Sequence, residues 1–198
     1  MIRLENLSKT DLQNIANTIA ESFLCEDGMI TRSLNLQEAS AYFDIMISEA
    51  YRVNGLYATS EKQEGYCIYW HKGKGPSTWR EILAFFTYMK RIPMYKLSNL
   101  VVSHHDWTDY EMQFQNEKDY LDVYLVVVRK EYQGQGFFRK MMEELMDIAR
   151  KDHVIMILDT DSELKAQKYM HVGMEVVTKK VLESGLHMYT LKYDILDS

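Results

Sequence analysis

The sequence predicts an α/β protein, and three observations support this fold class. An apolar run, a glycine-rich turn and an amphipathic helix follow one another over residues 124–150. A second strand and helix are expected over residues 153–174, and the first 70 residues fit two helices followed by a β-hairpin. A chain of 198 residues can bury one domain core but is short for two. We therefore expect a single domain over residues 1–198.

The N-terminal part predicts an edge strand, two helices and a hairpin, in that order. The edge strand lies in residues 1–7, and helices are expected at residues 9–25 and 36–52. Both helices place apolar side chains at helical spacing: Leu12, Ile15, Ala16, Ile19 and Phe23 in the first, and Ala39, Phe43, Ile47 and Ala50 in the second. Strands at 55–60 and 66–70, with a polar turn between them, then predict the hairpin.

The middle of the chain predicts a helical insertion around residues 77–118. A loop rich in glycine and lysine precedes a helix from Ser77 to Arg91, and Pro93 interrupts that helix. A second helix is expected from about Tyr95 into an aromatic segment that contains Trp107, Tyr110 and Phe114. These aromatic side chains either pack the helices on the sheet or line a pocket, and the pattern leaves both interpretations open.

The segment Tyr132–Arg139 is the most informative in the chain, with the sequence YQGQGFFR. It joins the apolar run at residues 124–128 to an amphipathic helix. Glycines in such a turn permit positive φ angles, which aim successive backbone N–H groups into one concavity. The N-terminus of the following helix adds a partial positive charge. The turn is therefore suited to bind a phosphate group.

Spacing narrows the choice of phosphate ligand. No Gly-Lys-Ser/Thr tripeptide occurs, which excludes a P-loop, and Arg139 stands where a dinucleotide fingerprint needs its third glycine. The remaining pattern, Gln/Arg-x-x-Gly-x-Gly/Ala, is met by Gln133 and Gly136, with Phe138 in the last place. This segment resembles the acetyl-CoA loop of the GNAT superfamily of N-acetyltransferases. The alternative is an ordinary glycine-rich turn between a strand and a helix.

A second segment at residues 153–174 strengthens the resemblance. A buried strand is followed by a helix that Thr160 and Glu163 would start as a capping box and that Gly173 would end. The order Ala166, Tyr169, Gly173 and Met174 is similar to the second GNAT motif, in which a helix tyrosine precedes a Gly-Phe pair. Glu163 stands where the family often has an asparagine that contacts the cofactor.

The resemblance implies a fold in which a mixed, mostly antiparallel central sheet is flanked by helices. It holds residue by residue only over about residues 119–174, and elsewhere it concerns topology. A C-terminal hairpin, with strands at residues 175–182 and 187–193, agrees with this fold and would close the sheet.

The resemblance also implies a reaction, in which an amine attacks acetyl-CoA directly within a ternary complex. The backbone of Val126, Val127 and Val128 would pair with the pantetheine arm, and one of these N–H groups would polarise the thioester carbonyl. The pyrophosphate would lie on the loop formed by Gln133, Gly134, Gln135, Gly136, Phe137, Phe138 and Arg139.

The same resemblance assigns roles to side chains. Tyr169 would protonate the departing thiolate, the alternative being a tyrosine that only packs on its helix. Asp122 is the expected base, acting through water, and Glu111, His104 and His187 are competing candidates. Because the insertion precedes the cofactor strand, Trp107 and Tyr110 are expected to line the pocket for the acceptor, a primary amine of a small molecule or peptide.

Composition limits the remaining choices. A formal net charge of −6 disfavours a nucleic-acid partner and favours a cationic one. No apolar run or signal peptide predicts a membrane association, and two cysteines, Cys25 and Cys67, suggest a reduced cytoplasmic protein. No metal is expected, since His104-His105-Asp106 lacks the spacing of metal ligands.

The sequence leaves the oligomeric state open, and a homodimer is one possibility. The competing function is a non-catalytic CoA-binding sensor or interaction module, with Phe138 and Glu163 marking a weakened site.

Overall fold

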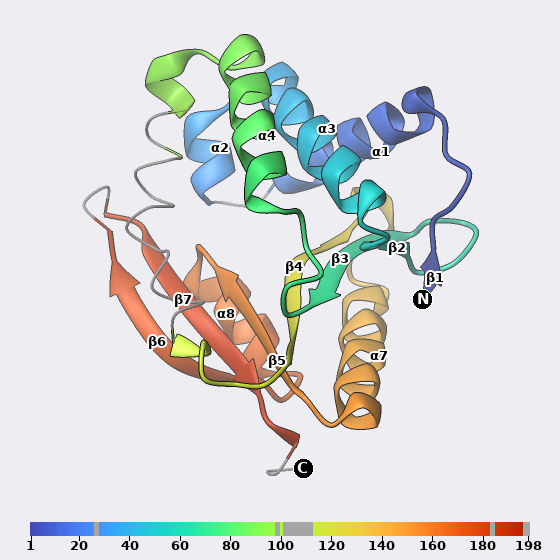
Figure 1. Cartoon of the computed structure of the whole chain (residues 1–198), viewed down its shortest axis with the longest axis vertical. Coiled ribbons are helices and arrows are strands. Elements are labelled where there is room, and N and C mark those ends of the chain that lie inside the picture. Colours follow the sequence, from blue (N-terminus) through green and yellow to red (C-terminus); the bar gives the residue numbers. More distant parts are fainter. Residues whose placement is uncertain (26–27, 98–99, 101–112, 183–184, 196–198) are drawn as a thin grey trace.

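The protein is described from a computed structural model that covers residues 1–25, 28–97, 100, 113–182 and 185–195. Helices in these ranges include α1 (Lys9–Phe23), α2 (Met29–Ser33), α3 (Leu36–Arg52), α4 (Thr78–Arg91), the 3-10 helix η1 (Lys130–Tyr132), α7 (Phe137–Asp152) and α8 (Glu163–Met170). Strands are β1 (Ile2–Arg3), β2 (Leu56–Ala58), β3 (Gly65–His71), β4 (Tyr120–Val128), β5 (Ile155–Thr160), β6 (Glu175–Val181) and β7 (His187–Tyr193). Figure 1 shows their arrangement.

The described strands form one seven-stranded sheet in the order β1-β2-β3-β4-β5-β7-β6. Only β4 and β5 are parallel, and every other neighbouring pair is antiparallel. This confirms the predicted α/β fold with a mixed, mostly antiparallel sheet flanked by helices. The C-terminal hairpin extends the sheet as predicted, with β7 paired to β5 and β6 at the edge.

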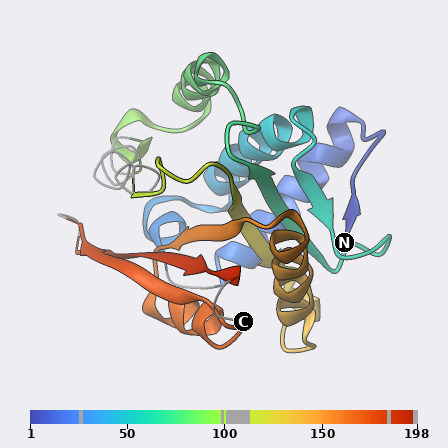
Figure 2. The same ribbon diagram turned by 60° about the horizontal axis from the view of Figure 1, so that its bottom comes forward.

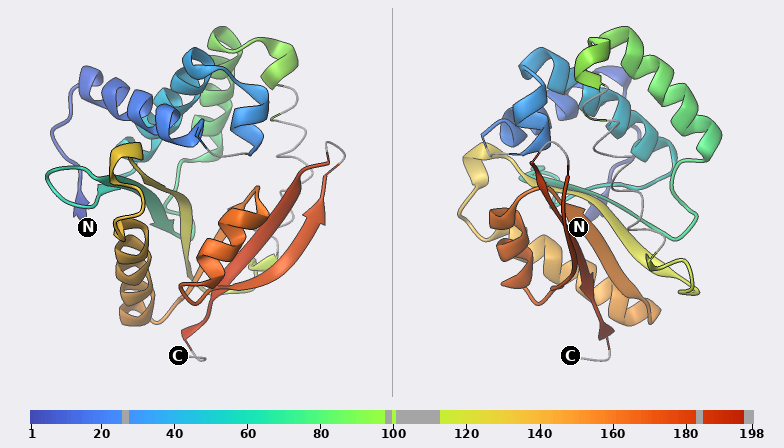
Figure 3. Two further views of the ribbon diagram at one scale, coloured as in Figure 1. Left: turned by 180° about the vertical axis from the view of Figure 1, so that it is seen from behind. Right: turned by 90° about the vertical axis from the view of Figure 1, so that its left-hand side faces the viewer.

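Two apolar cores lie on opposite faces of the sheet. Helices α1 and α3 pack on one face, over Leu56, Ile68, Leu125 and Val127. Helices α7 and α8 cover the other face, over Leu121, Val123, Met156 and Leu191. Figures 2 and 3 show α7 and α8 on the side of the sheet away from α1 and α3. Burial of these two apolar faces is the main force that holds the layers together.

Local sequence signals explain where several helices begin and end. Ser8 and Asp11 form a capping box for α1, and Asn35 and Glu38 form one for α3. Helix α3 has the predicted bounds. Helix α4 stops at Arg91, because Ile92 precedes Pro93 and takes an extended conformation with φ −122°.

Helix α8 begins differently from the prediction and ends as predicted. Thr160 does not cap it, because Thr160 is the last residue of β5, is buried and pairs with Tyr189 of β7. Ser162 precedes the helix instead, without a capping side-chain hydrogen bond. Gly173, with φ +103°, closes the helix: its N–H donates to the Met170 carbonyl, and the Met174 N–H donates to the Tyr169 carbonyl. These two bonds are those of a Schellman motif.

A β-bulge divides β4 into two parts. Ile68 of β3 pairs with Leu125, and the next residue, Tyr69, pairs with Val123, so Tyr124 has no partner on β3. The extra residue reverses the alternation of side chains along the strand. Before the bulge Leu121 and Val123 face the core under α7, and after it Leu125 and Val127 face the opposite core.

Within the described ranges, every helix is too short or too polar to span a lipid bilayer.

Candidate active site

The sheet opens between β4 and β5. These parallel strands pair only at Tyr120–Ile155, Leu121–Met156 and Asp122–Ile157. Beyond Asp122, the part of β4 that contains Val126, Val127 and Val128 continues without a partner on the β5 side. Backbone N–H and C=O groups on that side are therefore able to pair with an extended ligand.

The glycine loop lies at the end of this unpaired edge. Gly134 and Gly136 have φ angles of +74° and +85°, and a Cβ atom on either would meet no other atom within 4 Å. Gly136 precedes α7, and the first bond of that helix runs from the Lys140 N–H to the Gly136 carbonyl. The N–H groups of residues 137–139 therefore have no acceptor inside the helix. This is the geometry that binds a phosphate group.

The two glutamines of the loop bond to β4 and to η1, respectively. The Gln133 side-chain amide donates to the Val128 carbonyl at 3.2 Å, and the Gln135 amide donates to the Glu131 carbonyl at 3.0 Å. The Arg129 N–H, directly after β4, donates to the Glu64 carbonyl at 2.9 Å. The shape of the loop thus depends on its own hydrogen bonds and leaves the N–H groups at the helix end for a ligand.

One cavity of about 1070 Å³ runs from this loop through the opening of the sheet. Its lining includes most of the residues that the sequence singles out: Asp122, Val126, Val127, Val128, Gln133, Gly134, Gly136, Phe137, Phe138, Arg139 and Tyr169. Gln135 is not among the lining residues. The cavity therefore joins the predicted phosphate loop to the predicted acid and base, which are far apart in sequence.

Tyr169 and Phe138 meet at the loop end of the cavity. Their rings are 5.3 Å apart between centroids and inclined by 62°. Phe138 is half-buried and packs on the core under α7, so its side chain leaves the helix N-terminus clear. Glu163 is the first residue of α8, is exposed and is absent from the cavity lining.

Asp122 lies at the point where β4 and β5 separate. Its carboxylate is buried and accepts a hydrogen bond from the Trp70 indole N–H at 3.2 Å. The Trp70 ring also packs against Tyr124, with 5.2 Å between centroids. Gly75 lies beneath the indole, where a Cβ atom would come within 2.8 Å of the Trp70 nitrogen. Asp122 is thus held in place from a neighbouring strand.

The end of the cavity beyond Asp122 is built from residues that the sequence analysis missed. They are aromatic or acidic and come from distant elements: Tyr42 from α3, Trp70 from β3, Glu81 from α4, Tyr124 from β4 and Asp159 from β5. Burial, followed by the charges of Asp159 and Asp161, raises the pKa of Tyr42 to about 12. Asp159 follows the paired part of a parallel strand, which is a position where ligands often bind and a signal that sequence reasoning could have used.

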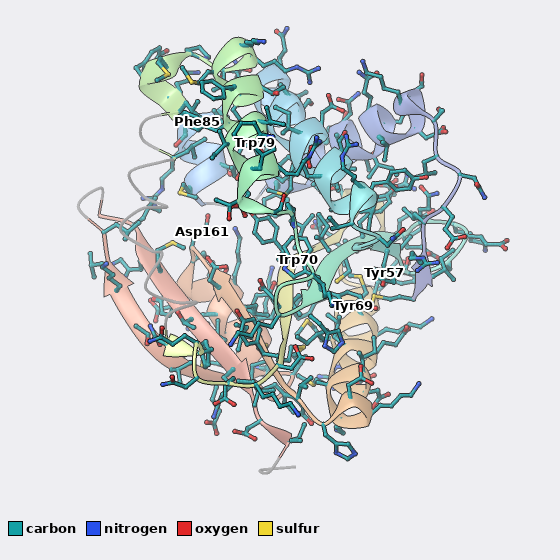
Figure 4. All side chains as sticks on the ribbon, in the orientation of Figure 1. Tyr57, Tyr69, Trp70, Trp79, Phe85 and Asp161 are labelled. Carbon is teal, nitrogen blue, oxygen red and sulfur yellow. The ribbon has the colours of Figure 1, made fainter. Side chains whose placement is uncertain are left out.

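Asp161 connects the two sides of the opening. Its carboxylate accepts a hydrogen bond from the Met29 N–H of α2 at 2.6 Å and from the Lys165 ammonium of α8 at 2.7 Å. Figure 4 shows Asp161 and Trp70 between the N-terminal helices and the strands. This contact joins residues that are 132 positions apart in the sequence, and both Met29 and Asp161 line the cavity.

The remaining candidates fall in two groups. His187, one of the competing candidates for the base, is exposed at the start of β7 and is not among the residues that line the cavity. Trp107 and Tyr110, predicted to contact the acceptor, lie outside the described residues, as do the competing bases His104 and Glu111 and the segment His104–Asp106.

Comparisons with known proteins agree with this geometry. Residues 100–174 match the model of the acetyltransferase (GNAT) family. No curated protein matches the chain in sequence. Among solved structures, arylalkylamine N-acetyltransferase 2 from Aedes aegypti aligns with a TM-score of 0.65 at 10% identity, covering 96% of this chain and 97% of that chain. The polyamine N-acetyltransferase of Drosophila melanogaster aligns with a TM-score of 0.63 at 9% identity and the same coverage. At these identities, the likeness to solved structures establishes the fold alone.

Proposed function

We propose that this chain, whose residues 100–174 match the model of the GNAT acetyltransferase family, is an acetyltransferase that transfers an acetyl group from acetyl-CoA to a primary amine of a small molecule or peptide. The observation that carries the proposal is that the predicted parts of the site all line one cavity. It connects a loop suited to phosphate, an unpaired strand edge and two groups able to move protons, Tyr169 and Asp122.

Acetyl-CoA fits the loop end of the cavity. The N–H groups at the start of α7 would bind the pyrophosphate, and Arg139 and Lys168, which both line the cavity, add positive charge there. The pantetheine arm would pair with the free edge of β4 in the way that an added strand does. A backbone N–H of Val126, Val127 or Val128 would then donate to the thioester carbonyl and stabilise negative charge on its oxygen.

The reaction needs two proton transfers. The neutral amine nitrogen attacks the acetyl carbon, forming a C–N bond while the C–S bond of the thioester breaks. Asp122, oriented by the Trp70 N–H, accepts the proton of the amine through water. Tyr169, which lines the same cavity, donates a proton to the departing thiolate. The products are the N-acetylated amine and CoA, and no acyl-enzyme forms.

Purified protein can test this function directly. We would mix it with acetyl-CoA and a panel of primary amines and short peptides, and measure free thiol release and the acetylated product. Since the attacking amine must be neutral, the rate should rise with pH until the bound acceptor and the base are deprotonated. Protein that binds CoA tightly but acetylates nothing in the panel would instead support a CoA-binding sensor or interaction module.

A further inference from the structure

Helix α4 has an apolar face that the described part of the chain leaves exposed. Five large apolar side chains of this helix are exposed by 39% to 67%: Trp79, Ile82, Leu83, Phe86 and Met89. None of the side chains of α4, all of which the structure describes, is buried. Figure 2 shows the helix at the periphery of the molecule, beyond α3. Large apolar side chains gathered on one exposed face indicate a contact with another molecule.

The other side of α4 is fixed to the protein. Phe85 and Tyr88 pack against the core that α1 and α3 cover. Arg80 donates two hydrogen bonds to Glu49 of α3, at 2.6 and 3.0 Å, and Arg91 forms an ion pair with the same helix. These contacts set the rotation of α4 about its own axis. The exposed apolar face therefore points away from the protein.

The exposed face has the spacing of a coiled-coil seam. One line of side chains follows α4 at intervals of four, three and four residues: Trp79, Leu83, Phe86 and Lys90. This alternation is that of the a and d positions of a heptad, which face a partner helix. Ile82 and Met89 flank the line on one side. The line of four residues, named the α4 seam below, has one charged member, Lys90 at its C-terminal end.

The α4 seam is complementary to a second copy of itself in one orientation. In an antiparallel pair of α4 helices, Leu83 of each copy lies opposite Phe86 of the other, and Trp79 lies opposite Lys90. The Lys90 ammonium then meets the Trp79 indole, the aromatic ring that attracts a cation most strongly. Two-fold symmetry forms this contact twice. In a parallel pair the two Lys90 side chains would meet each other and repel.

The area of the exposed face is sufficient for a weak dimer. Taking about 200 Å² for a large apolar side chain, the five exposed fractions leave about 500 Å² open on each copy. A two-fold contact would bury about 1,000 Å², which is the lower limit for a specific interface. We therefore expect dissociation in the micromolar range. A wholly apolar partner, in contrast, would bury the Lys90 ammonium without a counterpart, which costs free energy.

We propose that two copies of this chain associate through the α4 seam, as an antiparallel pair of helices centred on Leu83 and Phe86. The proposal does not depend on the acetyltransferase function. Glu81 comes two residues after Trp79, so it lies on the opposite side of the helix. There it lines the cavity. The partner copy would therefore stabilise one wall of the cavity from outside.

Sedimentation velocity of the purified chain tests the association. Between about 1 and 300 μM, the range in which a contact of this size should form, the mass should rise from one chain to two. Phe86→Glu should abolish the dimer, because it places a carboxylate at the centre of the seam. Leu164→Glu is the matched control and should dimerise normally, since Leu164 is 70% exposed on α8 and absent from the cavity lining. A chain that stays monomeric, or a dimer that persists in Phe86→Glu, would overturn the proposal.

Lys90 tests the orientation of the pair. Lys90→Glu should raise the dissociation constant at least about tenfold, because a carboxylate replaces the cation over the Trp79 ring. Lys90→Arg should keep the dimer, since a guanidinium also stacks on an indole. An unchanged dimer in Lys90→Glu would overturn the antiparallel pairing. Monomeric protein that sediments with vesicles of phosphatidylcholine and phosphatidylserine, but not as Phe86→Glu, would assign the α4 seam to a membrane surface instead.

Discussion

The two ends of the cavity are built in different ways. At the loop end, consecutive residues from Gln133 to Arg139 offer backbone N–H groups, and their positions follow from two glycines and a helix start. At the acceptor end, side chains converge from α3, α4, β3, β4 and β5, and no two of the main ones are neighbours in sequence. A backbone site of this kind tolerates many side chains, whereas a side-chain site depends on each residue. The loop end is therefore expected to determine that acetyl-CoA binds, and the acceptor end to determine which amine reacts.

The largest effect is expected at Tyr169, which packs against Phe138 at the loop end of the cavity. If Tyr169 protonates the departing thiolate, Tyr169→Phe should lower turnover by about 100-fold or more while the affinity for acetyl-CoA stays nearly the same. Single-turnover kinetics and calorimetry would measure the two quantities separately. Unchanged turnover in a single-turnover experiment would assign Tyr169 a structural role, such as its packing against Phe138, in place of the acid.

Next in size is the effect of a side chain in the loop. Gly136→Asp places a negative charge beside the expected pyrophosphate and should weaken acetyl-CoA binding at least tenfold, which corresponds to about 1.4 kcal/mol. The positive φ of Gly136 adds backbone strain to the substitution. Gly185→Asp is the control, because Gly185 has a similar φ of +77°, meets no neighbour within 4 Å and lies away from the cavity. Equal loss of affinity in both variants would mean that strain, not the site, is responsible.

A smaller effect is expected from Gly75→Ala at the acceptor end. The new methyl group would press on the Trp70 indole and displace the ring that orients Asp122. The acceptor KM should rise several-fold, with little change in the KM for acetyl-CoA. Gly73→Ala strains the backbone of the same loop, because Gly73 has φ +71°, but its methyl group meets no atom within 4 Å and does not touch Trp70. Parallel losses in the two variants would show that the loop, rather than Trp70, controls the acceptor.

The smallest effect on activity is expected at Glu64, which supports the loop end from the β2–β3 turn. Its carboxylate accepts hydrogen bonds from the Thr59 and Ser60 hydroxyls, both at 2.7 Å, and these lower its pKa to about 2. A depressed pKa means that the carboxylate stabilises the fold above its unfolded pKa of 4.5 and loses this effect as the pH falls toward 2. Glu64→Gln should therefore lower Tm by a few degrees at pH 7, and the difference should narrow below pH 4. A difference independent of pH would point to packing instead.

The same contrast explains what the sequence could predict. The loop, the free part of β4 and Tyr169 lie in motifs whose spacing is local, so their place in the cavity could be anticipated. Tyr124 could not, because the run from Tyr120 to Val128 contains no glycine or proline that marks a bulge. Glu81 is an ordinary charged residue until the fold places α4 at the cavity, whereas Asp159 could have been noted because it follows the paired part of a parallel strand. Thr160 shows the opposite error: a good local capping pattern was overridden by its pairing with β7.

The short pairing between β4 and β5 has a consequence for cooperativity. Three residue pairs join strands β1–β4 to strands β5–β7 within the sheet. Strands β5, β6 and β7, together with α8, come from one continuous segment, residues 155–193. Such a segment can open as a unit at a lower free energy than global unfolding, and its amide protons would then exchange together. A ligand bound across the opening would couple the two parts, so that hydrogen exchange in β5, β6 and β7 should slow in concert when acetyl-CoA is added.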